Sequence, residues 1–350
     1  MPIGQAFTTP SNWSRKMWSI DNRTPYQIER AWGRDADGVH EWIVAVKGTF
    51  DIRADGSLAL AEEQLAPLLM AQYHGKPGLS SLRYDADVVT SKPTTDVVLN
   101  GTAYAPGGRP STEFTIGMVV GPVRKALRVR GDRRWERGTF GAIRSACEAV
   151  TQVPLVYERA YGGYDHADPD PAQHCLDTRN PVGVGVVSKG PSPGQALPNF
   201  EYLNGSLDKA GPAGLGPIDS CWSPRREFLG TYDEAWQRGR YPLLPADWDA
   251  RSLLCSPADQ QPSKHLRGGE RVELTNLTPS GRLSFSLPRV RLRFSTLLDG
   301  QTEEHLGQLA TVIIEPDHPR VLMVWQSSLL VRTNGDYLER TVVSEKVVLS

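Results

Sequence analysis

The chain has 350 residues, of which 39% are hydrophobic and 23% are charged, and its formal net charge is -1. This composition is that of a globular protein with ample apolar side chain for a core, and it excludes a disordered chain. A charge this close to zero gives no global field that would recruit nucleic acid or an anionic membrane. Glycine and proline contribute 33 and 27 residues, which favours many turns and short strands over long helices.

Alternating side chains in the first third of the chain predict β-strands. The apolar side chains of Trp42, Val44, Val46, Phe50 and Ile52 fall on one parity, as in a strand with one buried face. Residues 94–104 and 114–120 have the same β-forming composition. Residues 61–70 are the exception, because their composition predicts a helix that Pro67 must kink or shorten.

The middle third has a different composition. Residues 154–216 carry many glycines and prolines with little sustained periodicity, which predicts extended and looped segments. A loop of this length inside a compact domain is unusual and often functional. Residues 231–238 predict a short helix, with Thr231 as its N-cap and Glu234 completing a capping box.

Alternation returns in the last third, at residues 282–294 and 312–325, and predicts antiparallel strands with one wet face. We therefore predict a mainly β fold, an antiparallel β-sandwich or open barrel-like sheets, with a loop-rich middle region and a few short helices. The predicted regions are an N-terminal β region (1–150), a loop-rich middle segment (151–265) and a C-terminal β region (266–350). The two β regions are expected to share one core.

An acidic stretch at residues 165–175 combines carboxylates, imidazoles and a thiol that could ligate a divalent ion. Its spacing fits no zinc template, and the glycine and final glutamate of a calcium loop are missing. Asp168-Pro-Asp-Pro is also ordinary turn chemistry, so we interpret the stretch as solvated turns. We predict no metal, no cofactor and no catalytic residues, because there is no nucleophile elbow, histidine pair or phosphate-binding glycine motif. Ser327 and Ser328 lie in an apolar strand and fit a polar packing role.

A basic run extends from Arg124 to Arg137, with Trp135 embedded in it. Because Leu127 and Val129 alternate with arginines, the run fits the solvated outer face of a strand. An acidic protein partner and a nucleic acid stay as alternatives.

Two tryptophans, a tyrosine and two arginines occur together between residues 222 and 236. These residue types are the ones most enriched at interface hot spots. The candidate protein-binding residues are Arg159, Tyr161, Asp165, Trp222, Arg225, Tyr232 and Trp236. The alternative is that they pack inward and hold the middle region against a sheet.

The chain begins Met-Pro-Ile-Gly-Gln, without the basic and apolar regions of a secretion signal, and no apolar run approaches the length of a membrane span. The four cysteines are far apart and form no C-x-x-C pair, which favours free thiols in a reducing compartment, with a disulfide as the alternative. We therefore expect a cytoplasmic protein.

Separated blocks of the chain resemble a bacterial family known as domain of unknown function 2169 (DUF2169), encoded beside type VI secretion effectors. In chain order these blocks are 81–84 (SLRY), 92–96 (KPTTD), 101–106 (GTAYAP), 131–135 (GDRRW), 157–163 (YERAYGG), 180–185 (NPVGVG), 197–201 (LPNFE), 222–225 (WSPR), 230–236 (GTYDEAW), 259–261 (DQQ) and 268–274 (GGERVEL). The resemblance spans roughly residues 10 to 330.

This resemblance implies a cytoplasmic chaperone or adaptor that stabilises a cognate secreted toxin. It would help load the toxin onto the spike complex through a PAAR-like part of the toxin, and contact the spike protein VgrG indirectly. No nucleic acid or membrane partner is implied, and no catalytic residue can be carried over. Two other classes stay open: a hydrolase using Asp165 or Asp168 with a histidine, and a lectin-like sandwich stacking sugars on Trp222 or Trp236.

Overall fold

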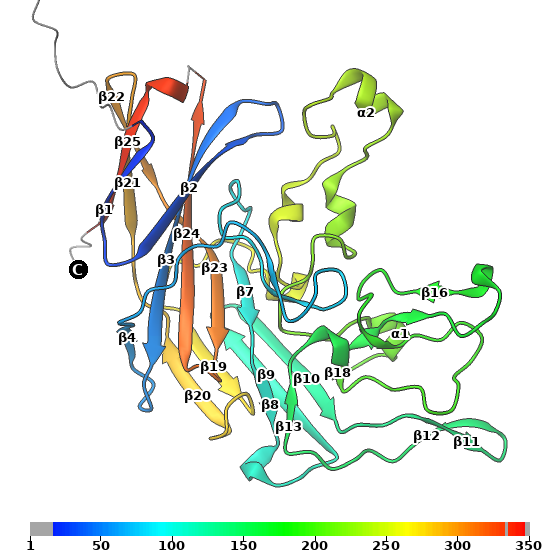
Figure 1. Cartoon of the computed structure of the whole chain (residues 1–350). Coiled ribbons are helices and arrows are strands. Elements are labelled where there is room, and N and C mark those ends of the chain that lie inside the picture. Colours follow the sequence, from blue (N-terminus) through cyan, green and yellow to red (C-terminus); the bar gives the residue numbers. More distant parts are fainter. Residues whose placement is uncertain (1–16, 333–334, 347–350) are drawn as a thin grey trace, which may run out of the picture.

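The computed structural model describes residues 17–332 and 335–346. The N-terminal residues used to predict the absence of a secretion signal lie outside this part of the chain. Figure 1 shows a long central sheet with one sheet packed along its upper half, another along its lower half, and loops to one side. The strands of the central sheet are β2 (Gln27–Arg34), β3 (His40–Ile52), β4 (Leu58–Leu60), β7 (Asp96–Leu99), β23 (Gln308–Glu315) and β24 (Arg320–Val331).

The central sheet joins the two ends of the chain. Its order is β2-β3-β24-β23-β7, with β4 on β3, and its neighbours are antiparallel except for the parallel pair β23 and β7. Its two long strands, β3 and β24, pair over their full shared length from His40↔Val331 to Asp51↔Arg320. Strands from the first and last thirds therefore form one continuous surface.

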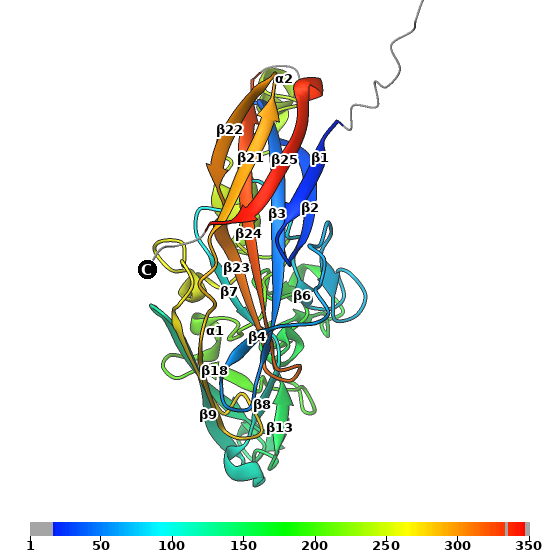
Figure 2. The ribbon, with the colours of Figure 1, turned by 90° about the vertical axis from the view of Figure 1, so that its left-hand side faces the viewer.

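Two smaller sheets cover the same face of the central sheet, one above the other (Figure 2). The upper sheet contains β1 (Ser19–Arg23), β25 (Leu338–Glu345), β21 (Leu292–Leu298) and β22 (Gln301–Leu306). The lower sheet contains β18 (Phe200–Tyr202), β10 (Val123–Arg130), β9 (Glu113–Val120), β19 (Arg271–Thr275) and β20 (Arg282–Ser286). One apolar core joins all three sheets, including Trp42 and Val46 of β3, Phe294 of β21 and Ile116 of β9. This architecture of open sheets confirms the predicted mainly β fold.

The outer face of the central sheet is covered by residues 61–92, a segment without long helices or strands. Gln64 hydrogen-bonds both the N–H and the C=O of Thr49 at 2.9 Å, so its amide acts as a strand partner for β3. The helix predicted over residues 61–70 is therefore wrong, because this tertiary pairing and Pro67 hold the segment extended. The covering segment also buries the second face of β3, and Glu41 and Lys47 on that face are 5% and 2% exposed.

The remaining elements are short. They are β5 (Gln72–Tyr73), β6 (Leu82–Tyr84), β8 (Thr102–Tyr104), β11 (Trp135–Gly138), β12 (Gly141–Arg144), β13 (Gln152–Pro154), β14 (Tyr161–Gly162), β15 (Tyr164–Asp165), β16 (Cys175–Leu176), β17 (Val184–Gly185), α1 (Leu207–Ala210), α2 (Glu234–Gly239) and the 3-10 helices η1 (Pro106–Gly108), η2 (Tyr157–Arg159), η3 (Pro171–Gln173), η4 (Arg225–Leu229), η5 (Ala250–Leu253), η6 (Ala258–Gln260) and η7 (Gly335–Tyr337). The strand predicted over residues 94–104 is divided into β7 and β8 at Asn100 and Gly101. In the part of the chain that the structure describes, no helix combines the length and apolarity that a membrane crossing needs. The four cysteines are unpaired.

Candidate protein-binding surface

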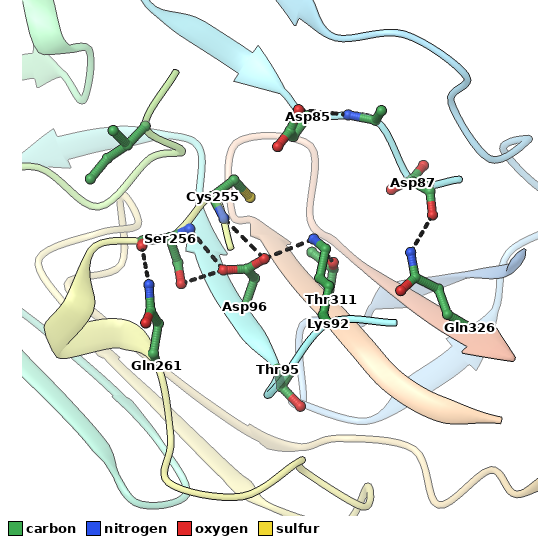
Figure 3. Close-up of polar contacts among 12 residues, drawn as sticks. Asp85, Asp87, Lys92, Thr95, Asp96, Cys255, Ser256, Gln261, Thr311 and Gln326 are labelled. Atoms are coloured by element: carbon green, nitrogen blue, oxygen red, sulfur yellow. Dashed lines mark hydrogen bonds and ion pairs between the residues drawn. The ribbon is translucent and has the colours of Figure 1, made fainter. Parts of the chain in front are cut away.

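A buried ion pair at the central sheet holds the loop-rich middle region through hydrogen bonds to its carboxylate (Figure 3). Lys92 donates to Asp96 at 2.8 Å, and their side chains are 2% and 0% exposed. Asp96 also accepts hydrogen bonds from the N–H of Cys255 at 3.1 Å and from the N–H and hydroxyl of Ser256 at 2.8 and 2.6 Å. Burial opposes both charges, but mutual attraction wins, because the pKa of Lys92 is raised and the pKa of Asp96 is lowered. We call Lys92, Asp96 and Ser256 the sheet clasp.

The predicted residues Trp222 and Arg225 form a second internal fastening. Arg225 is 8% exposed, pairs with Asp85 at 2.6 Å, and donates to the carbonyls of Ser252 and Ile218 at 2.7 and 2.9 Å. Trp222 is 5% exposed and packs edge-on against Tyr157, with ring centroids 5.6 Å apart. Both side chains are thus buried within this chain, as the inward-packing alternative describes, and Trp222 offers no face for a sugar.

Arg159, Tyr161 and Asp165 lie at the surface of the loop region and also bond locally. Arg159 donates to Asp132 at 3.0 Å and to Asn199 at 3.1 Å. Asp165 accepts from the N–H and hydroxyl of Ser188 and from the N–H of Ala167, and these bonds lower its pKa. Tyr161 is half-buried beneath the guanidinium of Arg179. These contacts hold loops together and leave parts of Arg159 and Tyr161 accessible.

The acidic stretch at residues 165–175 is built from turns. Asp168 accepts from the N–H of Asp170 and pairs with Lys189, while Asp170 accepts from the N–H of Ala172. His174 bonds the hydroxyl of Tyr164 and the carbonyl of Asp168. Across residues 17–332 and 335–346, no three His, Cys, Asp or Glu side chains gather as a metal site would need. The oxygens proposed for a hydrolase are therefore engaged in local hydrogen bonds.

A serine and a histidine do meet between the sheets, and their surroundings disfavour a nucleophile. His305 hydrogen-bonds Ser327 through Nδ1 and Thr296 through Nε2. Ser327 is 4% exposed, and burial lowers the pKa of His305 to about 4. A catalytic base needs access to substrate and a partner that orients it, whereas this ring lies between two hydroxyls. Ser327 instead serves the polar packing that its strand position predicts.

The predicted residues Tyr232 and Trp236 lie on a projecting arm, residues 230–248, which carries α2 away from the sheets (Figure 1). Trp236 contacts Tyr232 and Tyr241 edge-on, with ring centroids 4.8 and 5.7 Å away. Tyr232 and Tyr241 are 54% and 69% exposed. We call these three side chains the arm aromatics, and they form an apolar surface with polar tips, as binding surfaces commonly do.

Local hydrogen bonds hold the arm in shape. The indole N–H of Trp236 donates to the carbonyl of Leu243 at 2.8 Å, and Arg240 donates to the carbonyl of Ala36 in the turn between β2 and β3 at 2.8 Å. The capping box predicted from Thr231 is wrong, because Asp233 caps α2 by accepting from the N–H of Trp236. Thr231 bonds Asp247 instead, which closes the base of the arm.

A groove of about 460 Å³ lies at the base of the arm, between η4, η5, η6 and α1. Its lining includes Phe228, Leu254 and Pro257, with Arg251 stacked 4.1 Å over the ring of Phe228. Grooves of a few hundred Å³ with apolar walls and few polar groups are typical of binding sites. The arm aromatics and this groove together form the candidate protein-binding surface.

Two exposed aromatic features were missed by the sequence analysis. Tyr241 follows α2 and completes the arm aromatics. The hairpin of β11 and β12 carries a fully exposed Phe140 at its turn and an Ile143 that is 52% exposed. Gly138 and Gly141 bracket this turn and could have indicated a hairpin. The arginines of the preceding basic run were the only feature considered there.

The arginines of the basic run are largely neutralised within the chain. Arg130 pairs with Glu113 at 2.7 Å and with Glu201 at 3.2 Å, and Arg133 also pairs with Glu201. Arg128 lies beside the same two carboxylates. Arg124, Arg128 and Arg130 lie on the outer face of β10, as the alternation predicted. Lys125 is instead on the buried face and pairs with Asp259, and the part of the run from Arg133 onward follows the strand.

Comparison with known proteins relates the chain to one family. The profile of a family described as "Uncharacterized protein conserved in bacteria (DUF2169)" matches residues 37–326. No curated protein and no solved structure matched the chain.

Proposed function

The chain belongs to the DUF2169 family of bacterial proteins, and we propose that it is a cytoplasmic adaptor for a type VI secretion effector. It binds the cognate toxin, stabilises it, and helps seat it on the VgrG spike through a PAAR-like region. The sequence blocks follow one another in the order found in the family, and this resemblance supports the adaptor role. Binding without catalysis suffices, since a partner that binds only the folded cargo stabilises it by mass action.

The arm aromatics carry the proposal. Tyr232 and Tyr241 leave more than half of their surface open on a braced arm, and the base of this arm adjoins an apolar groove. Tyrosine on a rigid support supplies a large contact area at a small entropic cost. The polar residues of the family blocks, in contrast, are occupied by internal bonds, as in the sheet clasp and at Arg225. A protein partner is therefore the ligand class that the accessible side chains fit best.

The direct test is co-expression with the neighbouring effector gene, followed by size-exclusion chromatography and affinity measurement. The wild-type chain should co-elute with the effector and increase its soluble yield. The double substitution Tyr232→Ala with Tyr241→Ala should weaken binding by roughly 10-fold or more, since hot-spot truncations cost on the order of 2 kcal/mol.

Tyr337→Ala is the matched control, because that tyrosine is 52% exposed and lies in η7, which belongs neither to the arm nor to the groove at its base. It should bind as the wild type does. If the wild-type chain does not co-elute with the effector, the adaptor role is refuted. If the double variant binds the effector as tightly as the Tyr337→Ala control does, the arm is not part of the binding surface.

A further inference from the structure

A second groove, of about 490 Å³, opens where the upper and lower sheets meet against the central sheet. Four connections border it: the segment before β19, the link from β20 to β21, the turn from β22 to β23, and the residue after β25. These strands belong to all three sheets, so the groove follows from the way the sheets abut. It shares no lining residue with the groove at the base of the arm.

The lining of this seam groove is strongly basic. Its charged or titratable residues are Lys264, His265, Arg267, Arg291 and Lys346, and no aspartate or glutamate of the described chain lines it. None of these five forms an ion pair with a carboxylate elsewhere in the described residues, although many other lysines and arginines of the chain do. Two lysine and two arginine side chains therefore surround one groove in a chain whose net charge is -1.

The neighbouring carboxylates do not pair with these cations. Glu270 accepts a hydrogen bond from the backbone N–H of Arg267 through Oε1 at 2.8 Å, and its Oε2 is buried without a hydrogen-bond partner among the described residues. Glu345 hydrogen-bonds Tyr26, and with burial it raises the pKa of that phenol. Each therefore bonds to a group other than the lysine and arginine side chains of the groove. An external anion would supply the missing counter-charge.

The floor of the seam groove is apolar. Leu266, Leu292 and Trp325 are buried beneath it, and Leu306 at its edge is 64% exposed. A small inorganic anion would use the cations and leave this apolar surface wet. A nucleic acid would favour an exposed aromatic platform for its bases, but Trp325 is only 2% exposed. A peptide that carries both carboxylates and apolar side chains matches the rim and the floor together.

We propose that the seam groove binds an extended acidic segment of a protein partner, in which Asp or Glu residues are interspersed with apolar ones. The inference rests on the proposed function, since the segment belongs to the effector cargo, and it adds the chemistry of a second contact. The cations at the rim attract the carboxylates, and Leu306 and the floor bury the apolar side chains. Contacts at two separated surfaces would raise avidity for one cargo.

The test uses the full chain and a short fluorescein-labelled peptide in which Glu alternates with Leu and Phe, measured by fluorescence anisotropy. The groove variant is Lys264→Glu, Arg291→Glu and Lys346→Glu, all at exposed positions. The control is Arg109→Glu, Arg124→Glu and Arg282→Glu, which makes the same change in charge at exposed positions outside the groove. Equal melting temperatures of the three proteins establish that each is folded.

The groove variant should bind the peptide roughly 10-fold or more weakly, whereas the control should stay close to the wild type. A peptide with Gln in place of Glu should lose affinity to a similar extent, and added salt should weaken binding. Equal weakening of both variants, or no binding by the wild type, would overturn the proposal. A single-stranded oligonucleotide that binds the groove more tightly than the peptide would also overturn it.

The effector complex separates this inference from the adaptor role. If the effector co-elutes and the groove variant holds it as tightly as the wild type does, the groove proposal fails and the adaptor role stands. If the peptide binds in the groove but no effector co-elutes, the groove's preference for acidic segments stands and the effector is the wrong partner.

Discussion

Replacing Lys92 with methionine tests whether the sheet clasp holds the middle region in place. The carboxylate of Asp96 is fully buried, and the substitution would leave it with only the neutral donors of Cys255 and Ser256. Breaking a buried pair by removing one partner costs on the order of 3–5 kcal/mol, because the remaining charge is uncompensated. Asp96→Asn should cost a similar amount, since it strands the ammonium of Lys92 beside the hydroxyl of Thr311.

The double variant Lys92→Met with Asp96→Asn removes both charges and should recover part of the loss. Urea titration followed by tryptophan fluorescence measures each change, with Lys189→Met as the control. Lys189 pairs with Asp168 at the same 2.8 Å, but its side chain is 60% exposed, so its loss should cost less than about 1 kcal/mol. If Lys92→Met proves no more destabilising than the control, the clasp does not hold the structure and the reasoning fails.

Two further predictions follow from buried titratable groups. Burial lowers the pKa of His305 from 6.5 to about 4, so the unfolded chain takes up this proton at a higher pH than the folded chain. The free energy of unfolding is therefore undiminished by this group above pH 6.5 and should fall by about 2–3 kcal/mol as the pH drops toward 4. His305→Asn should flatten this pH dependence in urea titrations, and an unchanged slope would contradict the assignment. Burial also raises the pKa of the Cys255 thiol, whereas Cys175 and Cys221 are exposed. Ellman's reagent should thus modify the two exposed cysteines in the native protein and Cys255 only after unfolding, a result that Cys→Ser variants would assign; rapid native labelling of Cys255 would show that the clasp region opens.

The β architecture could be predicted because its strands alternate on a period of two and lie between glycine-rich turns. That pattern alone indicates β3, β9, β10 and β24, without knowledge of the strands that pair with them. Burial of the second face of β3 could not be predicted in the same way. Lys47 on that face is a surface residue by composition, and only the covering segment, through Asp87 at 2.7 Å, makes it internal.

For the same reason, the sequence could not show which candidate site residues are buried and which are exposed. The candidates between residues 222 and 236 are all of types common at interfaces. Trp222 and Arg225 are nevertheless buried, whereas Tyr232 and Trp236 belong to the arm. The difference depends on partners far away in the sequence, such as Asp85 for Arg225 and Tyr157 for Trp222. No local pattern distinguishes a guanidinium that meets a buried carboxylate from one that meets a partner protein. The predicted capping box was wrong for a related reason, because the hydroxyl of Thr231 bonds Asp247 across the base of the arm.

The distribution of buried and exposed groups has a consequence for specificity. Removing a member of the sheet clasp would leave a buried charge unpaired, so substitutions there act on the stability of the whole chain. Tyr232 and Tyr241 on the arm and Leu306 at the seam groove leave much of their surface exposed, so substitutions at these positions should change stability little. Such a scaffold can change which partner it binds without reworking its fold. The arm and seam variants should therefore lose affinity at unchanged melting temperature, whereas the clasp variants should lose both together.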